Sequence, residues 1–276
     1  MSTPMIQAAV TMNQLQNKMD LIGNNMANSQ TTGYKGRQAE FSSLLIQNVN
    51  NMTDPANMQG RLTPDGIRVG SGAMLGSTNI DLTPGSIKET DRALDMALLA
   101  DNHFFQIQVT ENDIEETRYT RDGTFYLSPV NDNQDVMLTT GDGNPVMGQN
   151  GPIVIAEGFD SIEVQPNGQI AVSLGAQTEI AGELAVVEMM RPRLLEVSGE
   201  NALRMPDVAE LGFNPEEIIQ DVVPNTDLMR SGVLENSNVD ISKQMTDLIT
   251  AQRAYQLNAQ TISTGDQMMG LINQLR

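Results

Sequence analysis

The sequence predicts an α+β protein with one helical domain built from both ends of the chain and one domain of strands between them. Apolar residues recur every seven positions near both termini, which is the spacing of paired helices. Between the termini, short apolar runs are joined by Asp-Gly and Asn-Gly pairs, which favour antiparallel hairpins. The expected architecture is a discontinuous coiled-coil-like domain from the N- and C-terminal helices, plus a central all-β domain of short antiparallel strands.

The N-terminal helix is predicted from two rows of residues that share the seven-residue spacing. Thr3 is suited to cap the helix and Pro4 to occupy its first position, and the helix should run to about Asn28. Both rows lie on one face, where they would contact another helix. The residues predicted at this assembly interface are Met5, Met12, Leu15, Met19, Ile22 and Met26.

The C-terminal helix repeats this pattern and should begin after Ser237 or Asn238, either of which can cap it. About 36 residues of helix would be roughly 54 Å long, which does not suit the interior of a compact domain. The apolar stripe must therefore meet another helix, either in a hairpin that holds the two ends of one chain together or in an interface between subunits. A single pair of helices leaves apolar surface uncovered, which favours the interface between subunits. The interface residues predicted on this helix are Ile241, Met245, Leu248, Tyr255, Ile262 and Met269.

The middle of the chain is predicted to form a β-sandwich or barrel-like domain. Asp122-Gly123 and Asn167-Gly168 are the strongest hairpin signals, and Asp142-Gly143 marks a further turn. The predicted domain boundaries are 1–46 for the N-terminal helix and its motif, 47–75 for an extended arm or linker, 76–230 for the central β domain, and 231–276 for the C-terminal helix.

The charge of the chain is concentrated in its middle. The net charge is −19, yet residues 1–50 sum to +1 and residues 231–276 sum to −1. An acidic middle argues against nucleic acid and anionic membranes as partners. Nearly neutral ends suit crowded, repeated packing, because like charges stacked many times over would repel one another; short helices that happen to be balanced are the alternative explanation.

The composition excludes several kinds of chemistry. The chain has no Cys, a single His and no Trp, so disulfides, thiolate ligands, a Cys nucleophile and a two-His metal site are ruled out, and an aromatic small-molecule pocket is disfavoured. No apolar run is long enough to span a membrane, and the first 25 residues do not resemble a secretory signal peptide.

Local motifs that could carry chemistry are all incomplete. His103 is predicted to be a turn or strand-edge residue and not a catalytic base, because no Gly-x-Ser-x-Gly elbow accompanies it. Gly70–Gly76 lacks the Lys-Ser/Thr pair of a phosphate loop, and Asn131–Val136 lacks the Gly and closing Glu of a calcium loop. We therefore predict no catalytic residue, no metal site and no cofactor. Because acidic residues are plentiful, a secreted β-rich glycan hydrolase stays open as the alternative from another class.

The polar segment that follows the first helix resembles the N-terminal motif of the bacterial flagellar rod and hook proteins. In that family a helix ends in Asn-x-x-Asn, followed by Thr-x-Gly-aromatic-basic, and this chain reads "MDLIGNNMANSQTTGYKGRQAEF" from Met19 to Phe41. The residues that match the family motif are Asn25, Asn28, Thr31, Gly33, Tyr34 and Lys35.

The other end supports the same family. Leu234–Arg276 resembles the family's C-terminal helix, including the Gln-Arg-Ala-Tyr run that begins with Gln252 and Arg253. Two departures stand out: Ala100–His103 replaces a Gly-rich turn, and Gln244 replaces an acidic residue before the Met. Two terminal motifs in the correct order are far more specific than either alone.

The resemblance implies a non-enzymatic structural subunit of the flagellar basal-body rod, of the distal-rod or hook-basal body type. Such a subunit self-assembles through its terminal helices into a hollow helical drive shaft that transmits torque for motility. Its implied partners are further copies of itself, other axial proteins (rod and hook subunits) and the flagellar export apparatus, with no nucleic acid and no small-molecule substrate. It would reach the basal body of the flagellum through the type III export channel without a cleaved signal peptide. A hook-type subunit or a junction protein of the same axial family is the alternative.

Overall fold

A computed structural model describes residues 3–43, 46–49, 67–70, 73–111, 113–130, 135–175, 177–199, 201–206, 212, 214–223 and 227–274. The chain divides into two compact units. The helical unit comprises Met1–Met26, Arg37–Asn79 and Asp240–Arg276, and the β unit comprises Ala27–Gly36 and Ile80–Val239. Two long helices and many short antiparallel strands confirm the predicted α+β class.

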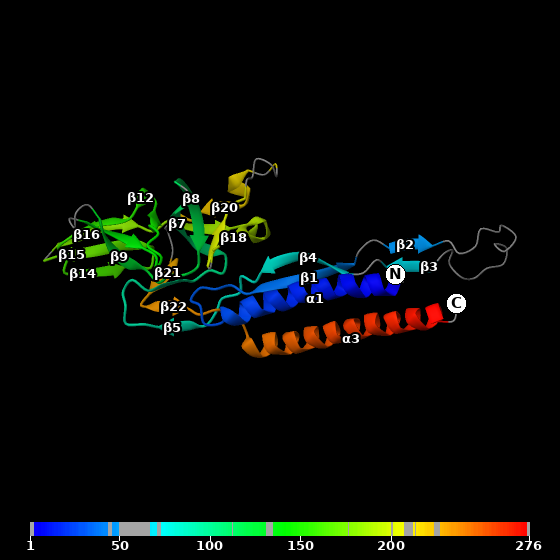
Figure 1. The fold of residues 1–276 in the computed structure, drawn as a ribbon. Coiled ribbons are helices and arrows are strands. Elements are labelled where there is room, and N and C mark those ends of the chain that lie inside the picture. The colour runs from blue at the N-terminus through cyan, green and yellow to red at the C-terminus, as the bar shows by residue number, and fades with distance from the viewer. Residues whose placement is uncertain are drawn as a thin grey trace. The chain divides into compact units, whose positions relative to one another are not determined.

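The helical unit contains two antiparallel helices, α1 (Thr3–Ala27) and α3 (Ile241–Gln274), which lie side by side in Figure 1. Met5 packs against Gly265 near one end of the pair, and the side chains of Asn25 and Gln244 are hydrogen-bonded at 3.4 Å near the other. The expected cap of α3 is wrong. Asp240 caps this helix, because its Oδ1 accepts hydrogen bonds from the backbone N–H groups of Ser242 (2.8 Å) and Lys243 (3.2 Å).

Two small ladders accompany the helices in this unit. Strand β1 (Arg37–Ser43) pairs with β4 (Ala73–Ile80), and β2 (Ile46–Val49) pairs with β3 (Ile67–Gly70). Strands β2 and β3 thus occupy described parts of the predicted 47–75 arm, and residues 50–66 and 71–72 of that arm lie outside the described residues.

The β unit is centred on an antiparallel sheet with the strand order β18-β19-β8-β7-β17-β20. These strands are β7 (His103–Glu111), β8 (Ile114–Thr120), β17 (Val186–Met189), β18 (Glu196–Ser198), β19 (Ala202–Arg204) and β20 (Ile219–Asp221). Two short 3-10 helices, η2 (Pro192–Leu194) and η3 (Pro215–Glu217), belong to the same part of the chain.

Smaller sheets complete the unit (Figure 1). One contains β14 (Ser161–Val164), β15 (Gln169–Leu174) and β16 (Gln177–Glu183), and another contains β9 (Tyr126–Val130), β10 (Asp135–Thr139) and β13 (Val154–Ala156). The two-stranded ladders pair β5 (Ile87–Glu89) with β22 (Val233–Glu235), β6 (Met96–Leu98) with β21 (Met229–Ser231), and β11 (Met147–Gly148) with β12 (Gly151–Pro152).

The predicted turns have different outcomes. Gly168 adopts a φ of +92° between β14 and β15, which confirms the Asn167-Gly168 hairpin. The hairpin expected at Asp122-Gly123 is wrong, because β8 pairs with β7 and β19 whereas β9 pairs with β10. Gly123 is instead a close approach between backbones, where a Cβ would collide with the carbonyl oxygen of Met96.

The core of the β unit lies on both faces of the central sheet. Successive residues of a strand point to opposite faces, so Phe105 joins the larger cluster and Phe104 the smaller one. In the larger cluster, Phe105 and Phe125 pack edge to face with their ring centroids 5.1 Å apart. The smaller cluster contains Tyr119 and Ile218 among others. The β unit thus buries two apolar clusters within one chain, while other large apolar side chains such as Ile114, Ile180 and Val223 are exposed.

Candidate functional site

The predicted interface residues of α1 are buried or half-buried in the helical unit. We call this set, together with Ala8 and four side chains of α3, the inner stripe. Its apolar core is small: Ala8, Ile22 and Ala251 are the fully buried apolar residues among the described parts of α1 and α3. The inner stripe contains Met5, Ala8, Met12, Leu15, Met19, Ile22 and Met26 of α1, and Leu248, Ala251, Tyr255 and Ile262 of α3.

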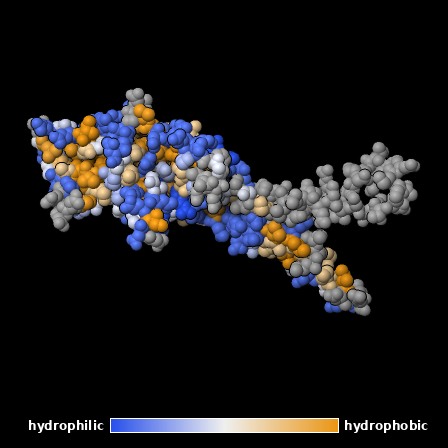
Figure 2. Space-filling view, turned by 90° about the horizontal axis from the view of Figure 1, so that it is seen from above, coloured by the Kyte–Doolittle hydropathy of each residue, from blue (hydrophilic) through white to orange (hydrophobic). Residues whose placement is uncertain are grey.

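Other apolar residues of α3 are exposed, and we call them the outer face. Ile241, Met245 and Ile249 are spaced by four residues, so each lies about 40° further round the helix than the one before. The outer face comprises Ile241, Met245, Ile249, Leu257, Met268, Leu271 and Ile272, whose exposed fractions run from 45% to 65%. Hydrophobic side chains reach the surface of the helical unit in Figure 2.

The structure therefore divides the residues predicted on α3 into two groups. Leu248, Tyr255 and Ile262 are half-buried in the inner stripe, whereas Ile241 and Met245 are exposed on the outer face. Met269 lies four residues beyond Gly265, the position that contacts Met5, and is 42% exposed. Two further motif residues that we predicted here, Gln252 and Arg253, are also exposed on α3.

Asn25 of the N-terminal motif joins three elements of the helical unit. Its side-chain amide is buried and forms two hydrogen bonds with the backbone of Arg37, from Nδ2 to the carbonyl oxygen (2.8 Å) and from the Arg37 N–H to Oδ1 (3.0 Å). Nδ2 also faces Gln244 of α3. The residue that departs from the family pattern, Gln244, thus supplies an oxygen acceptor for this motif asparagine.

The turn after α1 is formed by the next motif residues. Asn28 accepts two hydrogen bonds from Thr31, one at its carbonyl oxygen (3.2 Å) and one at Oδ1 (3.1 Å). Gly33 adopts a φ of +66°, and its N–H donates to the carbonyl oxygen of Glu235 at 2.7 Å. A Cβ at Gly33 would lie 2.6 Å from the backbone of Arg121, so two separate constraints require glycine here.

Lys35 of the motif is buried, with 6% of its side chain exposed. Its Nζ donates to Glu235 Oε1 (2.8 Å) and to the carbonyl oxygens of Leu82 (3.2 Å) and Thr83 (2.9 Å). An ammonium group has three N–H donors, so these three acceptors satisfy it completely. Tyr34, beside it in the chain, is also buried.

Arg121 binds the other oxygen of the same carboxylate. Its Nε donates to Glu235 Oε2 at 2.6 Å, and its two terminal nitrogens donate to four backbone carbonyl oxygens. Three of these carbonyls belong to Ala100, Asp101 and His103, within the turn where the chain departs from the family pattern, and the fourth belongs to Leu98. The guanidinium therefore holds that turn in place without a Gly-rich sequence.

We call Lys35, Arg121 and Glu235 the charge node. Burial raises the pKa of the Glu235 carboxyl, but the charge of Arg121 and hydrogen bonds from Lys35, Arg121 and the Gly85 N–H outweigh it, so the pKa lies below its usual value. Burial lowers the pKa of Lys35, and its hydrogen bond to Glu235 only partly offsets this effect. The node thus combines two cations and one anion with backbone oxygens that solvate the excess positive charge.

Asn238 reinforces the node from the next turn of the chain. Its Oδ1 accepts a hydrogen bond from the Gly36 N–H (2.7 Å), and its Nδ2 donates to the carbonyl oxygens of Asp81 (2.8 Å) and Thr83 (3.0 Å). Segments 33–36, 81–85 and 235–238 are thereby bound to one another. The sequence analysis predicted Lys35 and Gly33 but not Arg121 or Glu235, and it named Asn238 only as a possible cap of the C-terminal helix.

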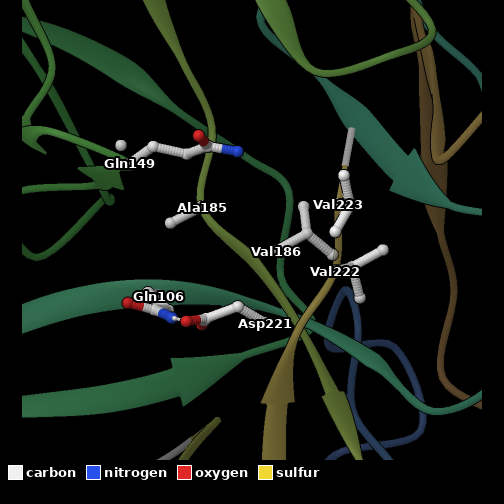
Figure 3. Close-up of a pocket in the computed structure, with 8 residues that line it drawn as sticks. Gln106, Gln149, Ala185, Val186, Asp221, Val222 and Val223 are labelled. Atoms are coloured by element: carbon white, nitrogen blue, oxygen red, sulfur yellow. Dashed lines mark hydrogen bonds between the residues drawn. The ribbon is translucent and has the colours of Figure 1, made fainter. Parts of the chain in front are cut away.

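A surface depression of about 360 Å³ is a further feature of the β unit (Figure 3). Its lining combines apolar side chains with Gln106, Gln149 and Asp221, and Gln106 donates to Asp221 at 3.3 Å. None of the predicted site residues lines it. Among the residues that the structure describes, no group of three or more His, Asp or Glu side chains could hold a metal ion. Nor does any helix in the described ranges have a stretch long and apolar enough to cross a membrane.

The elements that carry these features match family models. Residues 7–35 match a model described as flagella basal body rod protein, and residues 230–275 match one described as flagellar basal body rod FlgEFG protein C-terminal. Residues 99–172 match the D1 domain model of the flagellar hook protein FlgE/F/G. The first two matches together contain Lys35, Glu235 and Asn238, and the third contains Arg121.

Relatives that match over nearly the whole chain show which family it belongs to. The chain is 41% identical to the flagellar hook-basal body complex protein FlhP of Bacillus subtilis (strain 168), over 99% of this chain and 98% of that protein. The chain belongs to the flagellar basal-body rod family. Within this family it is also 31% identical to the flagellar basal-body rod protein FlgG of Buchnera aphidicola (strain APS), over 94% of both chains, and 31% identical to FlgG of Agrobacterium fabrum (strain C58), over 96% of both chains. The resemblance seen in the terminal motifs is confirmed.

Proposed function

We propose that this rod-family chain is a structural, non-enzymatic subunit of the basal-body rod. In this proposal its terminal helices assemble with those of further copies into a hollow shaft that transmits torque. The observation that carries the proposal is the outer face of α3, which one chain leaves exposed. The names of the relatives, rod protein and hook-basal body complex protein, support the same assignment.

The polar residues of α3 support burial of the outer face in an assembly. Thr246, Thr250, Thr261 and Thr264 are exposed, and each hydroxyl donates to the carbonyl oxygen four residues earlier in the helix at 2.9 Å. These hydroxyl donors are therefore satisfied inside the helix and would not be stranded when a neighbour covers the face. A neighbouring subunit can therefore displace water from the outer face without breaking these hydrogen bonds.

Charge supports packing against copies of the same chain. The charged residues of α1, Lys18 and Asp20, sum to zero, as do Lys243, Asp247, Arg253 and Asp266 of α3. The chain as a whole carries −19. Stacked helices of zero net charge avoid the repulsion that copies of the acidic β unit would experience at close range.

The parts of the proposal that concern partners, location and export rest on the family alone. We propose that the subunit contacts other axial proteins, lies in the basal body, and reaches it through the flagellar export apparatus without a cleaved signal peptide. A hook-type or junction subunit of the same axial family is the second candidate, which the name hook-basal body complex protein of one relative favours. The glycan-hydrolase alternative has no support among these relatives.

Substituting two leucines of α3 by aspartate, one at a time, tests the proposal. Leu257→Asp places a charge on the outer face, where the isolated subunit leaves the side chain 65% exposed. The variant should therefore keep wild-type stability as a monomer but fail to restore motility in a deletion strain, and axial proteins should be secreted without being assembled. Leu248→Asp should lower the stability of the monomer as well, because it places a charge at a half-buried position of the inner stripe.

A milder substitution at the same position provides an intermediate case. Leu257→Gln removes the apolar side chain without adding a charge, and it should weaken assembly less than Leu257→Asp. Normal swimming and normal rods in the Leu257→Asp strain would show that the outer face is not an assembly surface. Loss of monomer stability in Leu257→Asp would instead show that the residue belongs to the inner contact.

A further inference from the structure

The charge node binds the N-terminal motif to parts of the chain that are synthesised much later. Lys35 and Glu235 are separated by 200 residues, and Gly36 and Asn238 by 202. Asn201 also donates from its side chain to the carbonyl oxygen of Thr32. Closing a loop of this length in an unfolded chain is entropically costly, and contacts of high sequence separation form late unless the intervening chain has already folded.

The local backbone bonds in this segment are longer than several of its bonds to distant partners. Within 28–36, the N–H of Tyr34 lies 3.3 Å from the Thr31 carbonyl oxygen and the N–H of Thr31 lies 3.2 Å from that of Asn28. Three bonds to the distant partners Glu235 and Asn238 are 2.7–2.8 Å long, one of them from the buried charge of Lys35, and a fourth, from the Asn238 N–H to the Tyr34 carbonyl oxygen, is 3.4 Å long. Charge-assisted bonds of this length are the stronger kind, so the distant partners dominate the order of the segment.

We propose that Glu235 is the closing residue of the β unit, and that segment 28–36 becomes ordered only when Glu235 and Asn238 bind it. The central sheets fold first and fix Arg121 together with the turn at Ala100–His103. Strand β22 then brings the Glu235 carboxylate into place, where it accepts hydrogen bonds from Arg121, Lys35 and Gly85. These bonds connect the segments where the chain enters and leaves the β unit. Until Glu235 and Asn238 bind it, segment 28–36 has no fixed structure. This inference does not depend on the proposed rod function, because it concerns the free subunit.

Glu235→Gln provides the direct test in the full chain. The substitution keeps the shape of the side chain, but its amide group points N–H donors at a guanidinium or an ammonium group that also only donates. We expect hydrogen exchange at the amides of Gly33, Gly36 and Gly85 to accelerate by about tenfold or more, as for amides released from local structure. Exchange in β14, β15 and β16 should stay at the wild-type rate.

The matched control is Glu89→Gln, which removes an exposed carboxylate of the neighbouring strand β5. Glu89 pairs with Arg230 at 3.0 Å, and 79% of its side chain is exposed. This control should leave exchange in 28–36 unchanged. If Glu235→Gln exchanges like the wild type in 28–36, or accelerates β14–β16 by the same factor, the proposal is wrong. If the Glu235→Gln variant does not fold, Asn238→Ala tests the proposal through hydrogen exchange at the Gly36 amide.

Pulse-labelling of hydrogen exchange during refolding tests the order of events in the wild-type chain. Peptides covering Ser161–Glu183 should gain protection before peptides covering 28–36, and the latter should gain it together with peptides covering 233–238. Protection of 28–36 as early as that of Ser161–Glu183 would overturn the proposal, because the motif would then be ordered before its closing residue is in place.

Discussion

The β unit buries two apolar clusters within one chain, whereas the two helices of the helical unit bury few apolar side chains. In the β unit, two apolar clusters lie on the two faces of the central sheet, and even a three-charge node is buried with its hydrogen-bonding groups satisfied. In the helical unit, two long helices bury only Ala8, Ile22 and Ala251 among their described apolar residues and expose the outer face. Helices with so little buried apolar surface are expected to depend on neighbours for their stability.

The difference also shows in how each unit treats polar groups. The β unit buries charges, which is tolerable only where the partners are held in fixed geometry. The helical unit keeps its helices neutral and satisfies threonine hydroxyls within α3. Buried, paired charges favour one conformation of a single chain. Neutral helices with satisfied hydroxyl groups are suited to the proposed contact with a neighbouring subunit. Each prediction below tests one side of this contrast.

The largest effect is expected from Arg121→Met. The substitution removes the bonds to Glu235 and to the turn at Ala100–His103, and it leaves the carboxylate with Lys35 and Gly85 as donors. Breaking a buried ion pair in this way costs about 3–5 kcal/mol. Urea unfolding of the β unit, followed by circular dichroism, measures the loss. Arg230→Met, at an exposed ion pair, should cost less than about 1 kcal/mol; equal losses in the two variants would show that the node is no more important than a surface pair.

A somewhat smaller effect is expected from Gly33→Ala. The residue must adopt a φ of +66° and bring its Cβ within 2.6 Å of the Arg121 backbone. Left-handed strain and the collision together should cost about 2–4 kcal/mol in the free energy of unfolding.

Gly175→Ala is the matched control for this substitution. Gly175 has a φ of +63° and nothing within 4 Å of the added Cβ, so only the left-handed strain of about 1–2 kcal/mol applies. The difference between the two variants isolates the contact with Arg121. If both variants lose the same stability, the close approach of Gly33 to Arg121 contributes nothing.

The smallest effect concerns His103, the only histidine. Burial lowers its pKa below 6.5; the carboxylate of Glu188 opposes the shift and the charge of Arg121 adds to it. A lowered folded-state pKa means that the unfolded chain binds the proton more readily, so stability should rise with pH through the window that ends near pH 6.5. His103→Gln should flatten this rise, which is less than about 1 kcal/mol because the side chain is partly exposed. Thermal unfolding at pH 5.5 and 7 measures it, and an unchanged slope in His103→Gln would contradict the assignment.

Local sequence patterns predicted the elements of the fold better than their contacts. The seven-residue spacing placed the two helices closely, since α1 ends at Ala27 and α3 begins at Ile241. It could not separate Leu248 from Ile241 and Met245, because a single helix does not reveal which side its partner covers. The Asp122-Gly123 signal failed for a related reason: Gly123 is required by a contact with Met96, which lies far away in the sequence.

The candidate site was predictable only in part. The terminal motifs revealed Gly33 and Lys35, but nothing in one sequence shows that Lys35 meets Glu235 across 200 residues. Arg121 was likewise not predicted, because a polar residue beside a strand is usually exposed, and Asn238 was expected only as a helix cap. Burial and partners of such residues follow from the tertiary fold, which local patterns do not contain.

Limited proteolysis of the dilute subunit, with its monomeric state verified by sedimentation, tests the central contrast most directly. If the helical unit is incomplete in one chain, protease should trim both termini first and leave a resistant fragment close to residues 70–230, and the same termini should resist cleavage once the subunits have assembled. Helices α1 and α3 that resist cleavage in the verified monomer as long as the β unit does would contradict the account.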